Sequence, residues 1–381
     1  MVILMKRLIS VVLAVCFFVP AIGVRASGAA PEVNARSMIL TEFSTGQVLA
    51  ENNADERLAI ASVTKIMTLL LIMEAIEEGK ITMEDSVPVS ENAMSMGGST
   101  MFLEAGEELS VHEMIKGIAV ASANDGCVAM GEYISGSEEA FVERMNQRAK
   151  ELGMENTQFM NTNGLDEEGH YSSARDVAKM TQELLKHKKI FEYTTIWTGM
   201  MHNDKFELAN TNKLIRFYKG ANGLKTGSTD AAGCCLSATA ERDGMQLIAV
   251  VLGSPTSNDR FGGARALLDF GFANYSIERP CEPGAVINTV PVKKGVSDVV
   301  GIKAGSDCSV LIDKSLKSSM ETVYELPAEM TAPIKKDEKL GVIKFVAEGK
   351  VIAERDLYAS EDVAKKSFWG WFQDVLKRII G

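Results

Sequence analysis

The chain has 381 residues, of which 46% are hydrophobic and 24% charged, and its formal net charge is −11. This length suits two packed domains, and the acidic balance argues against nucleic-acid binding, which needs a basic surface. Besides Cys16, near the start, there are five cysteines and no C-x-x-C pair, so neither a disulfide framework nor a thiolate zinc site is expected. The four histidines show no H-E-x-x-H spacing, and no metal or cofactor is predicted.

Residues 1–26 have the layout of a secretory signal peptide. Lys6 and Arg7 give a basic start, an apolar run covers 8–19, and Val24-Arg25-Ala26 fits a cleavage site. The apolar run is short for a membrane-spanning helix, although an uncleaved anchor is the alternative. Either interpretation places the bulk of the chain outside the cytoplasm.

Residues 35–275 predict one antiparallel sheet with helices packed on it, an α+β arrangement. Strand-type runs lie at both ends of this segment, and a largely helical stretch fills its middle up to about residue 185. The expected hairpins span 37–50, turning at Ser44-Thr45-Gly46, and 234–252, turning at Asp243-Gly244. The expected helices span 66–76, 111–121, 141–152 and 260–275.

The composition shifts around Pro280-Cys281-Glu282-Pro283-Gly284. Short β-type runs separated by Gly, Asp and Lys then predict a small all-β domain over 280–358, without a catalytic constellation. The runs are 286–292, 299–304, 310–312, 322–326, 341–346 and 351–357.

The last stretch, 361–381, predicts an amphipathic helix. Its apolar residues repeat at a spacing of three to four, cations occupy much of the opposite face, and Trp369 and Trp371 are two of the three tryptophans. A basic amphipathic helix with an aromatic apolar face is typical of one lying in a membrane interface. The alternative is a terminal helix docked on the protein's own core.

Ser62 and Lys65 form the first chemical motif. They lie at the start of the predicted helix, three residues apart, so they share one face and the lysine amine can reach the serine hydroxyl. The serine is placed in the first turn, where backbone amides are free. This is the arrangement of a serine nucleophile with a lysine base, although S-x-x-K occurs by chance roughly once in a chain of this length.

Two further motifs follow. Ser122-Ala123-Asn124 ends the predicted helix 111–121, and Lys225-Thr226-Gly227 begins the late strand region. K-T-G alone occurs by chance in roughly one such chain in five. In this order, behind a secretory leader, the three resemble the S-x-x-K, S-x-N and K-T-G set of the penicillin-binding proteins and serine β-lactamases.

Other stretches resemble one branch, the D-alanyl-D-alanine carboxypeptidase family. They are Phe159–Asp166, His170–Ala174 and Gly223–Thr229, and only Ala123 departs, standing where many members have glycine or aspartate. The resemblance implies a β-lactamase/transpeptidase-like antiparallel sheet flanked by helices, with the all-β domain and terminal helix as the usual C-terminal portion. It divides the chain into a signal peptide (1–26), a serine D,D-peptidase domain (32–275), an all-β domain (280–358) and a membrane-anchoring helix (361–381).

The resemblance also implies roles for the motif residues. Ser62 attacks the carbonyl between two terminal D-alanines of a peptidoglycan stem peptide and forms an acyl-enzyme. Lys65 takes its proton, which requires a lysine pKa depressed by burial and by a neighbouring cation, with Lys225 the candidate. Ser122 relays a proton to the leaving amine, and Asn124 holds Lys65 and the substrate backbone.

The remaining implied residues bind substrate. Lys225 and Thr226 hold the terminal carboxylate, with Arg260 as an assistant, and Gly227 lets the substrate lie close to its strand. The oxyanion hole consists of the backbone N–H groups of Ser62 and Ser228. β-Lactams are expected as acylating inhibitors, and residues 361–381 are expected to attach the exported enzyme to the outer face of the cytoplasmic membrane.

Three rival functions remain open. A serine β-lactamase has the same nucleophile, but Asp166, Glu167 and Glu168 do not sit in a recognisable deacylating loop. A non-catalytic penicillin sensor or wall-binding module would not need Ser62 and Lys65 intact. A D,D-endopeptidase acting on cross-links uses the same groups and is the hardest rival to exclude.

Two other features have structural interpretations. His170 is predicted to be a structural loop histidine in preference to a catalytic base. The vicinal pair Cys234-Cys235 is predicted to pack on opposite faces of a strand.

Overall fold

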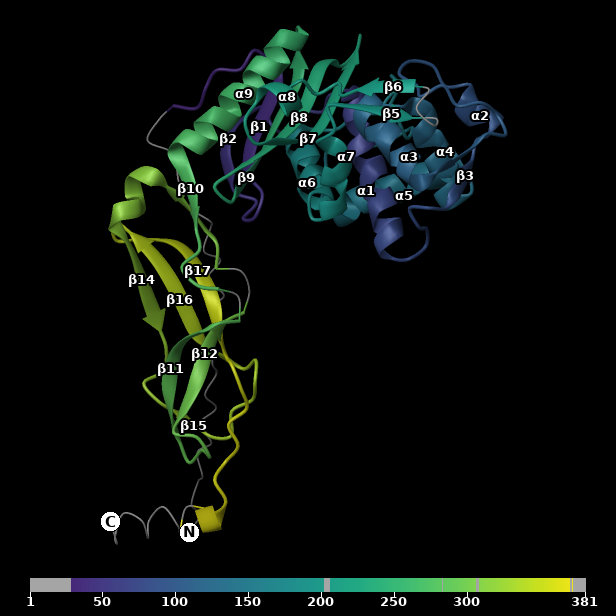
Figure 1. Cartoon of the computed structure of the whole chain (residues 1–381). Coiled ribbons are helices and arrows are strands. Elements are labelled where there is room, and N and C mark those ends of the chain that lie inside the picture. Colours follow the sequence, from purple (N-terminus) through teal and green to yellow (C-terminus); the bar gives the residue numbers. More distant parts are fainter. Residues whose placement is uncertain (1–28, 202–205, 283, 306–307, 371, 373–381) are drawn as a thin grey trace, which may run out of the picture.

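The computed structural model describes residues 29–201, 206–282, 284–305, 308–370 and 372. Figure 1 shows a larger mixed α/β part that runs to the end of α9 (Ser257–Asn274), and below it an elongated all-β part. The predicted signal peptide, 1–26, lies outside the described residues.

A five-stranded antiparallel sheet, in the order β2-β1-β9-β8-β7, forms the centre of the larger part. Both predicted hairpins are present, and the first strand of the sheet pairs with the last. Pairing runs from Ser37 with Leu252 to Glu42 with Leu247. The strands are β1 (Ser37–Glu42), β2 (Val48–Asn52), β7 (Ala221–Thr229), β8 (Gly233–Arg242) and β9 (Met245–Ser254).

Both faces of this sheet are covered, which explains why its central strands are almost continuously apolar. Successive side chains point to opposite faces, so Ile39 joins the core beneath the helices whereas Leu40 joins the core beneath α9. The helical side includes α1 (Lys65–Glu77) and α6 (Ala174–Leu184). The predicted fold class, an antiparallel sheet flanked by helices, is confirmed.

The helical middle contains helices and two small two-stranded sheets, β3-β4 and β5-β6. One prediction needs correction: the helix expected over 111–121 is α-helical only to Lys116 and continues as a π-helical segment, η2 (Gly117–Ala121), before Ser122. The other elements are η1 (Ala61–Thr64), β3 (Ser86–Pro88), α2 (Glu91–Met94), β4 (Glu108–Ser110), α3 (Val111–Lys116), α4 (Asn124–Ser135), α5 (Glu138–Glu151), η3 (Lys188–Ile190), α7 (Phe191–Thr194), β5 (Thr198–Met201), β6 (Phe206–Ala209) and α8 (Leu214–Phe217).

The all-β part has a core of its own and a six-stranded sheet in the order β14-β16-β17-β12-β11-β15. Strand β10 (Tyr275–Glu278), directly after α9, pairs with β13 (Val310–Asp313). The remaining elements are β11 (Val286–Lys293), β12 (Val299–Ala304), η4 (Lys314–Ser319), β14 (Met320–Glu325), β15 (Met330–Thr331), β16 (Lys339–Ala347) and β17 (Lys350–Ala359).

Cysteine use also differs from the expectation. Cys281 and Cys308, 27 residues apart, form a disulfide inside the core of the all-β part. An odd count of cysteines excludes complete pairing but does not exclude one bond. Cys127, Cys234 and Cys235 are free, and Cys235 is buried whereas Cys234 is partly exposed, as expected for neighbours on a strand.

The terminal helix predicted over 361–381 is not supported in its first part, because 361–367 is not helical. Val363 is buried and bridges to Ile334, and Lys365 bridges to Gly295, so this stretch belongs to the all-β part. Helical backbone is described at 368–370 and 372, whereas 371 and 373–381 lie outside the described residues. Among the helices that are described, none combines the length and apolarity needed to cross a membrane.

Candidate active site

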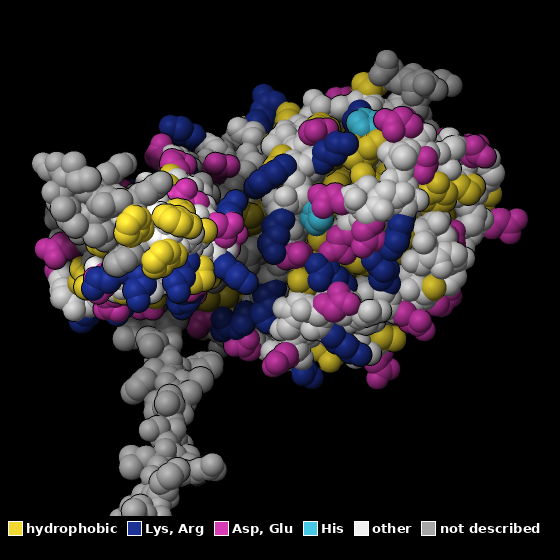
Figure 2. Space-filling model, turned by 90° about the horizontal axis from the view of Figure 1, so that it is seen from below, with side chains coloured by type: hydrophobic (Ala, Val, Ile, Leu, Met, Phe, Trp, Pro, Cys, Tyr) yellow, Lys and Arg dark blue, Asp and Glu magenta, His cyan; other side chains and the backbone are white. Residues whose placement is uncertain are grey.

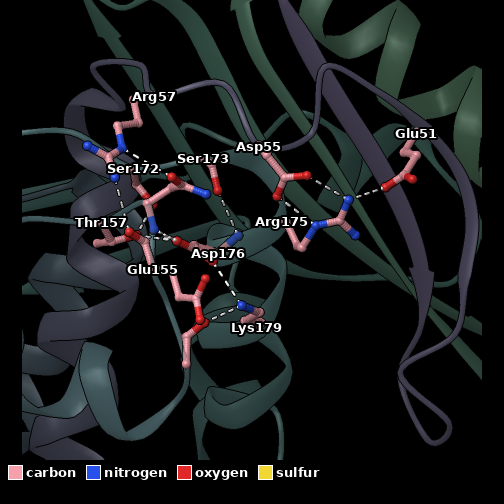
Figure 3. A network of polar contacts seen from close by, with 12 residues as sticks. Glu51, Asp55, Arg57, Glu155, Thr157, Ser172, Ser173, Arg175, Asp176 and Lys179 are labelled. Carbon is pink, nitrogen blue, oxygen red and sulfur yellow. Dashed lines mark hydrogen bonds and ion pairs between the residues drawn. The ribbon is translucent and has the colours of Figure 1, made fainter.

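Residues 51–55, in the segment that leads to Ser62, are held against the start of α6 by a polar network (Figure 3). Arg175 donates to Asp55 at 2.8 Å and to Glu51 at 2.6 Å, and its backbone N–H donates to the Ala54 carbonyl. Nearby, Ser173 caps α6. The segment just before Ser62 is therefore held in place by these contacts.

Ser62 lies in the 3₁₀ turn η1, directly before α1, and not in the first turn of the α-helix as predicted. Ala61, just before it, has φ of +48°, a left-handed value uncommon for a residue with a side chain. Gly164 packs against this turn so closely that a Cβ on it would come within 2.0 Å of the Ala61 carbonyl oxygen. The turn is thus shaped by its neighbours, as strained turns at functional sites commonly are.

Lys65 is fully buried and its amine joins three groups. Its Nζ lies 2.8 Å from Ser62 Oγ, 2.6 Å from Asn124 Oδ1 and 2.6 Å from the carbonyl oxygen of Asn163. A protonated amine can donate to all three. A neutral amine can donate to Asn124 and Asn163 while its lone pair accepts the Ser62 proton. The Lys65 amine therefore has hydrogen-bond partners both when it is protonated and when it is neutral.

Burial lowers the pKa of Lys65 to about 8, against smaller opposing effects of Cys127 and Asp125. Burial first, and then the charge of Lys65, lower the pKa of Lys225 well below its ordinary value. The predicted lowering of the Lys65 pKa by burial is found, whereas Lys225 is not among the causes that shift it. The charge of Lys65 instead lowers the pKa of Lys225. Burial of both amines thus favours the neutral form of each lysine.

Asn124 begins α4, where its side chain bridges two parts of the site. Its Nδ2 donates to the Gly97 carbonyl at 2.7 Å, which leaves Oδ1 for Lys65. Ser122, two residues earlier, is buried and left-handed, with φ of +67°. Ser122 and Asn124, which follow the π-helical segment η2, are thus both buried.

The K-T-G strand β7 runs directly past the nucleophile turn. A Cβ on Gly227 would come within 2.9 Å of the Ser62 nitrogen, so only glycine allows this approach. Lys225 is buried, and its Nζ donates to the Thr226 carbonyl at 2.9 Å. Ser228, the residue after Gly227, is exposed.

Thr211 is a site residue that the sequence interpretation missed. Its Oγ1 accepts from the Thr226 hydroxyl at 2.8 Å, and its N–H donates to the Val120 carbonyl, two residues before Ser122. Thr211 therefore ties the second motif to the third. It comes from an irregular loop with no recognisable pattern, so no local sequence signal marks it.

Arg260 approaches from α9 on the other side of β7. Its Nη1 donates to the Gly227 carbonyl at 2.8 Å and to the Cys235 carbonyl at 3.4 Å. These contacts brace the K-T-G strand. Within the described chain its buried Nε has no hydrogen-bond partner.

His170 lies beside the site in a structural setting. Its Nε2 lies 2.8 Å from Thr64 Oγ1, and its Nδ1 accepts from the Met160 N–H at 3.2 Å. Because Nδ1 is an acceptor, Nε2 carries the proton and donates to Thr64. Burial lowers the pKa of His170 to about 4, so the ring is neutral and ties the loop to the turn before Lys65.

The described residues hold no cluster of three or more His, Cys, Asp or Glu side chains suited to a metal ion. The groups gathered here, a hydroxyl, two amines and an amide, are those of acyl transfer through a serine.

A family model described as D-alanyl-D-alanine carboxypeptidase matches residues 24–256, more than half of the chain. The chain belongs to the D-alanyl-D-alanine carboxypeptidase family. A second model, described as the C-terminal domain of penicillin-binding protein 5, matches residues 275–365. Family membership confirms the main functional prediction, a serine-type D-alanyl-D-alanine carboxypeptidase.

Two proteins similar to this carboxypeptidase cover most of the chain, and a third covers about two thirds of it. D-alanyl-D-alanine carboxypeptidase DacF of Bacillus subtilis is 44% identical, across 99% of this chain and 98% of its own. The crystal structure of penicillin-binding protein 5 from Haemophilus influenzae is 32% identical and covers 89% of this chain and 100% of its own, with a TM-score of 0.81. Penicillin-binding protein D2 of Listeria monocytogenes, solved in an ampicillin-bound form, is 30% identical over 64% of this chain and 100% of its own, with a TM-score of 0.58.

Proposed function

We propose that this carboxypeptidase removes the terminal D-alanine from peptidoglycan stem peptides through an acyl-enzyme on Ser62. The observation that carries the proposal is the shared contact of the Lys65 amine with Ser62 and Asn124. It joins the first two motifs at 2.8 and 2.6 Å. Neutral Lys65 takes the Ser62 proton as the hydroxyl oxygen attacks the D-Ala-D-Ala carbonyl.

The negative charge that develops on the carbonyl oxygen is held by the N–H groups of Ser62 and Ser228. Support comes from the approach of Gly227 to the Ser62 nitrogen, which brings the two backbones into contact. Ser122 then relays the proton held by Lys65 to the leaving amine, so D-alanine departs and Lys65 is neutral again. Lys65 next takes a proton from the water that attacks the ester and returns it to Ser62 Oγ as the ester bond breaks. Release restores the Ser62 hydroxyl and leaves a peptide shortened by one residue.

The carboxylate of the departing D-alanine is assigned to Lys225 and the Thr226 hydroxyl. Thr211 adds a second hydroxyl at this point, because it is hydrogen-bonded to Thr226. Arg260 contributes by holding the Gly227 carbonyl and by its positive charge behind the strand. β-Lactams present a carboxylate and a strained amide to the same groups, so they acylate Ser62.

A β-lactamase is disfavoured because the nearby carboxylates have other partners. Asp166 accepts from the Thr229 hydroxyl at 2.6 Å, and Glu167 accepts from Asn161 at 2.9 Å. Neither is linked to Ser62 or Lys65 by a described contact. We therefore expect slow release of penicillin from the enzyme.

The test is D-alanine release from a defined stem pentapeptide by the full chain. Wild type should release one D-alanine per peptide, whereas Ser62→Ala should release none and should not retain labelled penicillin. A Ser110→Ala variant, which removes a helix-capping hydroxyl away from the reacting groups, serves as the matched control. Activity or labelling that survives in Ser62→Ala would refute the assignment. Parallel incubation with a cross-linked dimer separates carboxypeptidase from endopeptidase action.

Attachment to a membrane is proposed for the terminal segment, after export directed by residues 1–26. Phe368 and Trp369 are 73% and 70% exposed, and Figure 1 places 368–370 at the end of the all-β part farthest from the peptidase domain. From below, Figure 2 shows apolar side chains gathered on the all-β part beside a row of Lys and Arg. Such a surface suits an anionic lipid interface, with the all-β part as the spacer.

A further inference from the structure

Asp125, the residue after Asn124, is a buried carboxylate that the proposed mechanism does not use. It is 1% exposed. Its oxygens accept from the Met101 N–H at 3.0 and 3.1 Å and from the Leu103 N–H at 3.1 Å. It therefore fixes the backbone on both sides of the exposed Phe102, in a loop over 97–103.

The same loop is bound by Asn124. The Asn124 N–H donates to the Ser99 carbonyl at 2.7 Å, and its Nδ2 donates to the Gly97 carbonyl at 2.7 Å. An amide has one oxygen and one NH₂ group, so a carbonyl that binds the NH₂ group fixes the direction of the oxygen. That oxygen lies 2.6 Å from the Lys65 amine.

Packing holds the loop at a third point. A Cβ on Gly117 would come within 2.5 Å of the Met101 Sδ, and one on Gly126 within 3.2 Å. Met101 thus fills a slot that two glycines leave open, and it is fully buried there.

We propose that Asp125 is a positioning residue of the reaction: it holds the loop 97–103 against Asn124 and so keeps the Asn124 amide oxygen turned to Lys65. The inference rests on the proposed function, because it acts through the base of that mechanism. Asp125 touches no reacting atom and acts only through its neighbour.

The charge of Asp125 also affects the pKa of Lys65, which gives a second measurable effect of this residue. Lys65 is surrounded by Lys225 from β7, Cys127 and Asp125 from α4, and His170 from the neighbouring loop. Burial raises the pKa of Cys127 to about 12 and lowers that of His170 to about 4, so both are neutral at pH 7. Asp125 is then a negative charge that raises the pKa of Lys65, and its removal moves that pKa downward.

The test measures the acylation rate with a fluorescent penicillin, as a function of pH, for wild type and Asp125→Asn. We expect the plateau rate to fall about tenfold or more, because the buried contacts of a charged group are lost. The acid limb, where the rate rises as Lys65 loses its proton, should move to lower pH. A merely structural role would lower the active fraction without moving the limb.

A double-mutant cycle with Asn124→Ala tests whether Asp125 acts through Asn124. The double variant should be no slower than Asn124→Ala alone, whereas independent, multiplying losses would overturn the proposal. Met101→Ala, which keeps the charge but loosens the loop, should slow acylation with the limb unmoved. If Asp125→Asn does not fold, the acylation rate of Met101→Ala tests the role of the loop. A wild-type acylation rate in Met101→Ala would refute that role.

Glu42→Gln is the matched control. Glu42 is another 1% exposed carboxylate that binds backbone N–H groups, those of Ser44 and Thr45 in the first hairpin. Its loss should destabilise the fold without changing the pH profile. If wild type is not acylated on Ser62, the proposed function fails. If wild type is acylated and Asp125→Asn matches it in rate and profile, only this inference fails.

Discussion

Gly227 lies against the backbone of Ser62, so that a Cβ on the glycine would come within 2.9 Å of the serine nitrogen. The strand of the third motif and the turn of the first are therefore in direct backbone contact. The two N–H groups assigned to the oxyanion hole depend on this contact, because one belongs to Ser62 and the other to the residue after Gly227.

Gly227→Ala should consequently slow acylation by about a hundredfold, the usual effect of losing an oxyanion-hole donor. The added methyl group has to push the turn away, since it would also lie 2.7 Å from the Ile60 carbonyl oxygen. Labelling with fluorescent penicillin measures the rate. Gly262→Ala is the control: the site on α9 has open space for a Cβ, so labelling should be unchanged. Equal rates for the two variants would contradict the assigned geometry.

The pH dependence of acylation should follow Lys65. The lysine must be neutral to accept a proton, and burial lowers its pKa to about 8. The rate should therefore increase from pH 6 upward and level off above a midpoint near that value. Rapid-mixing acylation kinetics at constant ionic strength check this. A rate that stays flat across the range, or declines with rising pH, would show that another group supplies the base.

His170 should affect stability and not chemistry. Its pKa is about 4 in the fold and ordinarily 6.5, so between these values the unfolded chain takes up a proton that the folded chain does not. The free energy of unfolding should thus decrease as pH falls from 6.5 to 4, by up to about 3 kcal/mol. Urea unfolding of wild type and His170→Gln at several pH values tests this, with a flatter profile expected for the variant. Abolished acylation in a folded His170→Gln chain would instead make the histidine catalytic.

The Cys281–Cys308 bond should stabilise the all-β part alone. It closes a loop of 27 residues, for which the chain-entropy argument gives about 3 to 4 kcal/mol. Replacing both cysteines with serine should lower the unfolding temperature of this part while D-alanine release from a soluble pentapeptide stays at the wild-type rate. The control is Cys234→Ser, a partly exposed free thiol of the peptidase sheet. Impaired turnover in the double-serine chain would show that the two parts are coupled.

Removal of residues 367–381 should release the enzyme from anionic vesicles with its peptidase activity intact. The cut is placed after Lys366 because Val363 is buried in the all-β part and Lys365 bridges to Gly295. Cosedimentation with vesicles measures binding. Phe368→Ala with Trp369→Ala in the full chain should weaken it, whereas the exposed Tyr324→Ala on β14 should not. A truncated chain that still sediments would end the anchor hypothesis.

The sequence predicted the parts of the site that depend on residue type at fixed spacing. Ser62 and Lys65 lie three residues apart, and Ser122 and Asn124 lie two residues apart where one helix ends and the next begins, so local geometry was enough to pair their functions. Thr211, Gly97 and the Asn163 carbonyl were missed because they act through loops, two of them through backbone atoms that every residue has. No pattern of side chains encodes which carbonyl will face an amine after folding.

The errors at element ends have a similar origin. Apolar spacing through 111–121 fits a helix, but it does not distinguish α-helical from π-helical turns, and the change at Gly117 depends on tertiary packing. The disulfide was missed because counting cysteines constrains totals and not individual pairs. The hairpins of the sheet were predictable because short apolar runs bounded by turn residues, Ser44-Thr45-Gly46 and Asp243-Gly244, are local signals.

The pairing of β1 with β9 has a consequence for the order in which the protein matures. Ser37 meets Leu252, so the central ladder joins segments made early and late in synthesis. A chain that crosses a membrane from its N-terminus can complete this ladder only after most of the peptidase domain has emerged. Under the export proposed above, the Ser62 site would therefore be assembled only after β9 has followed β1 across the membrane.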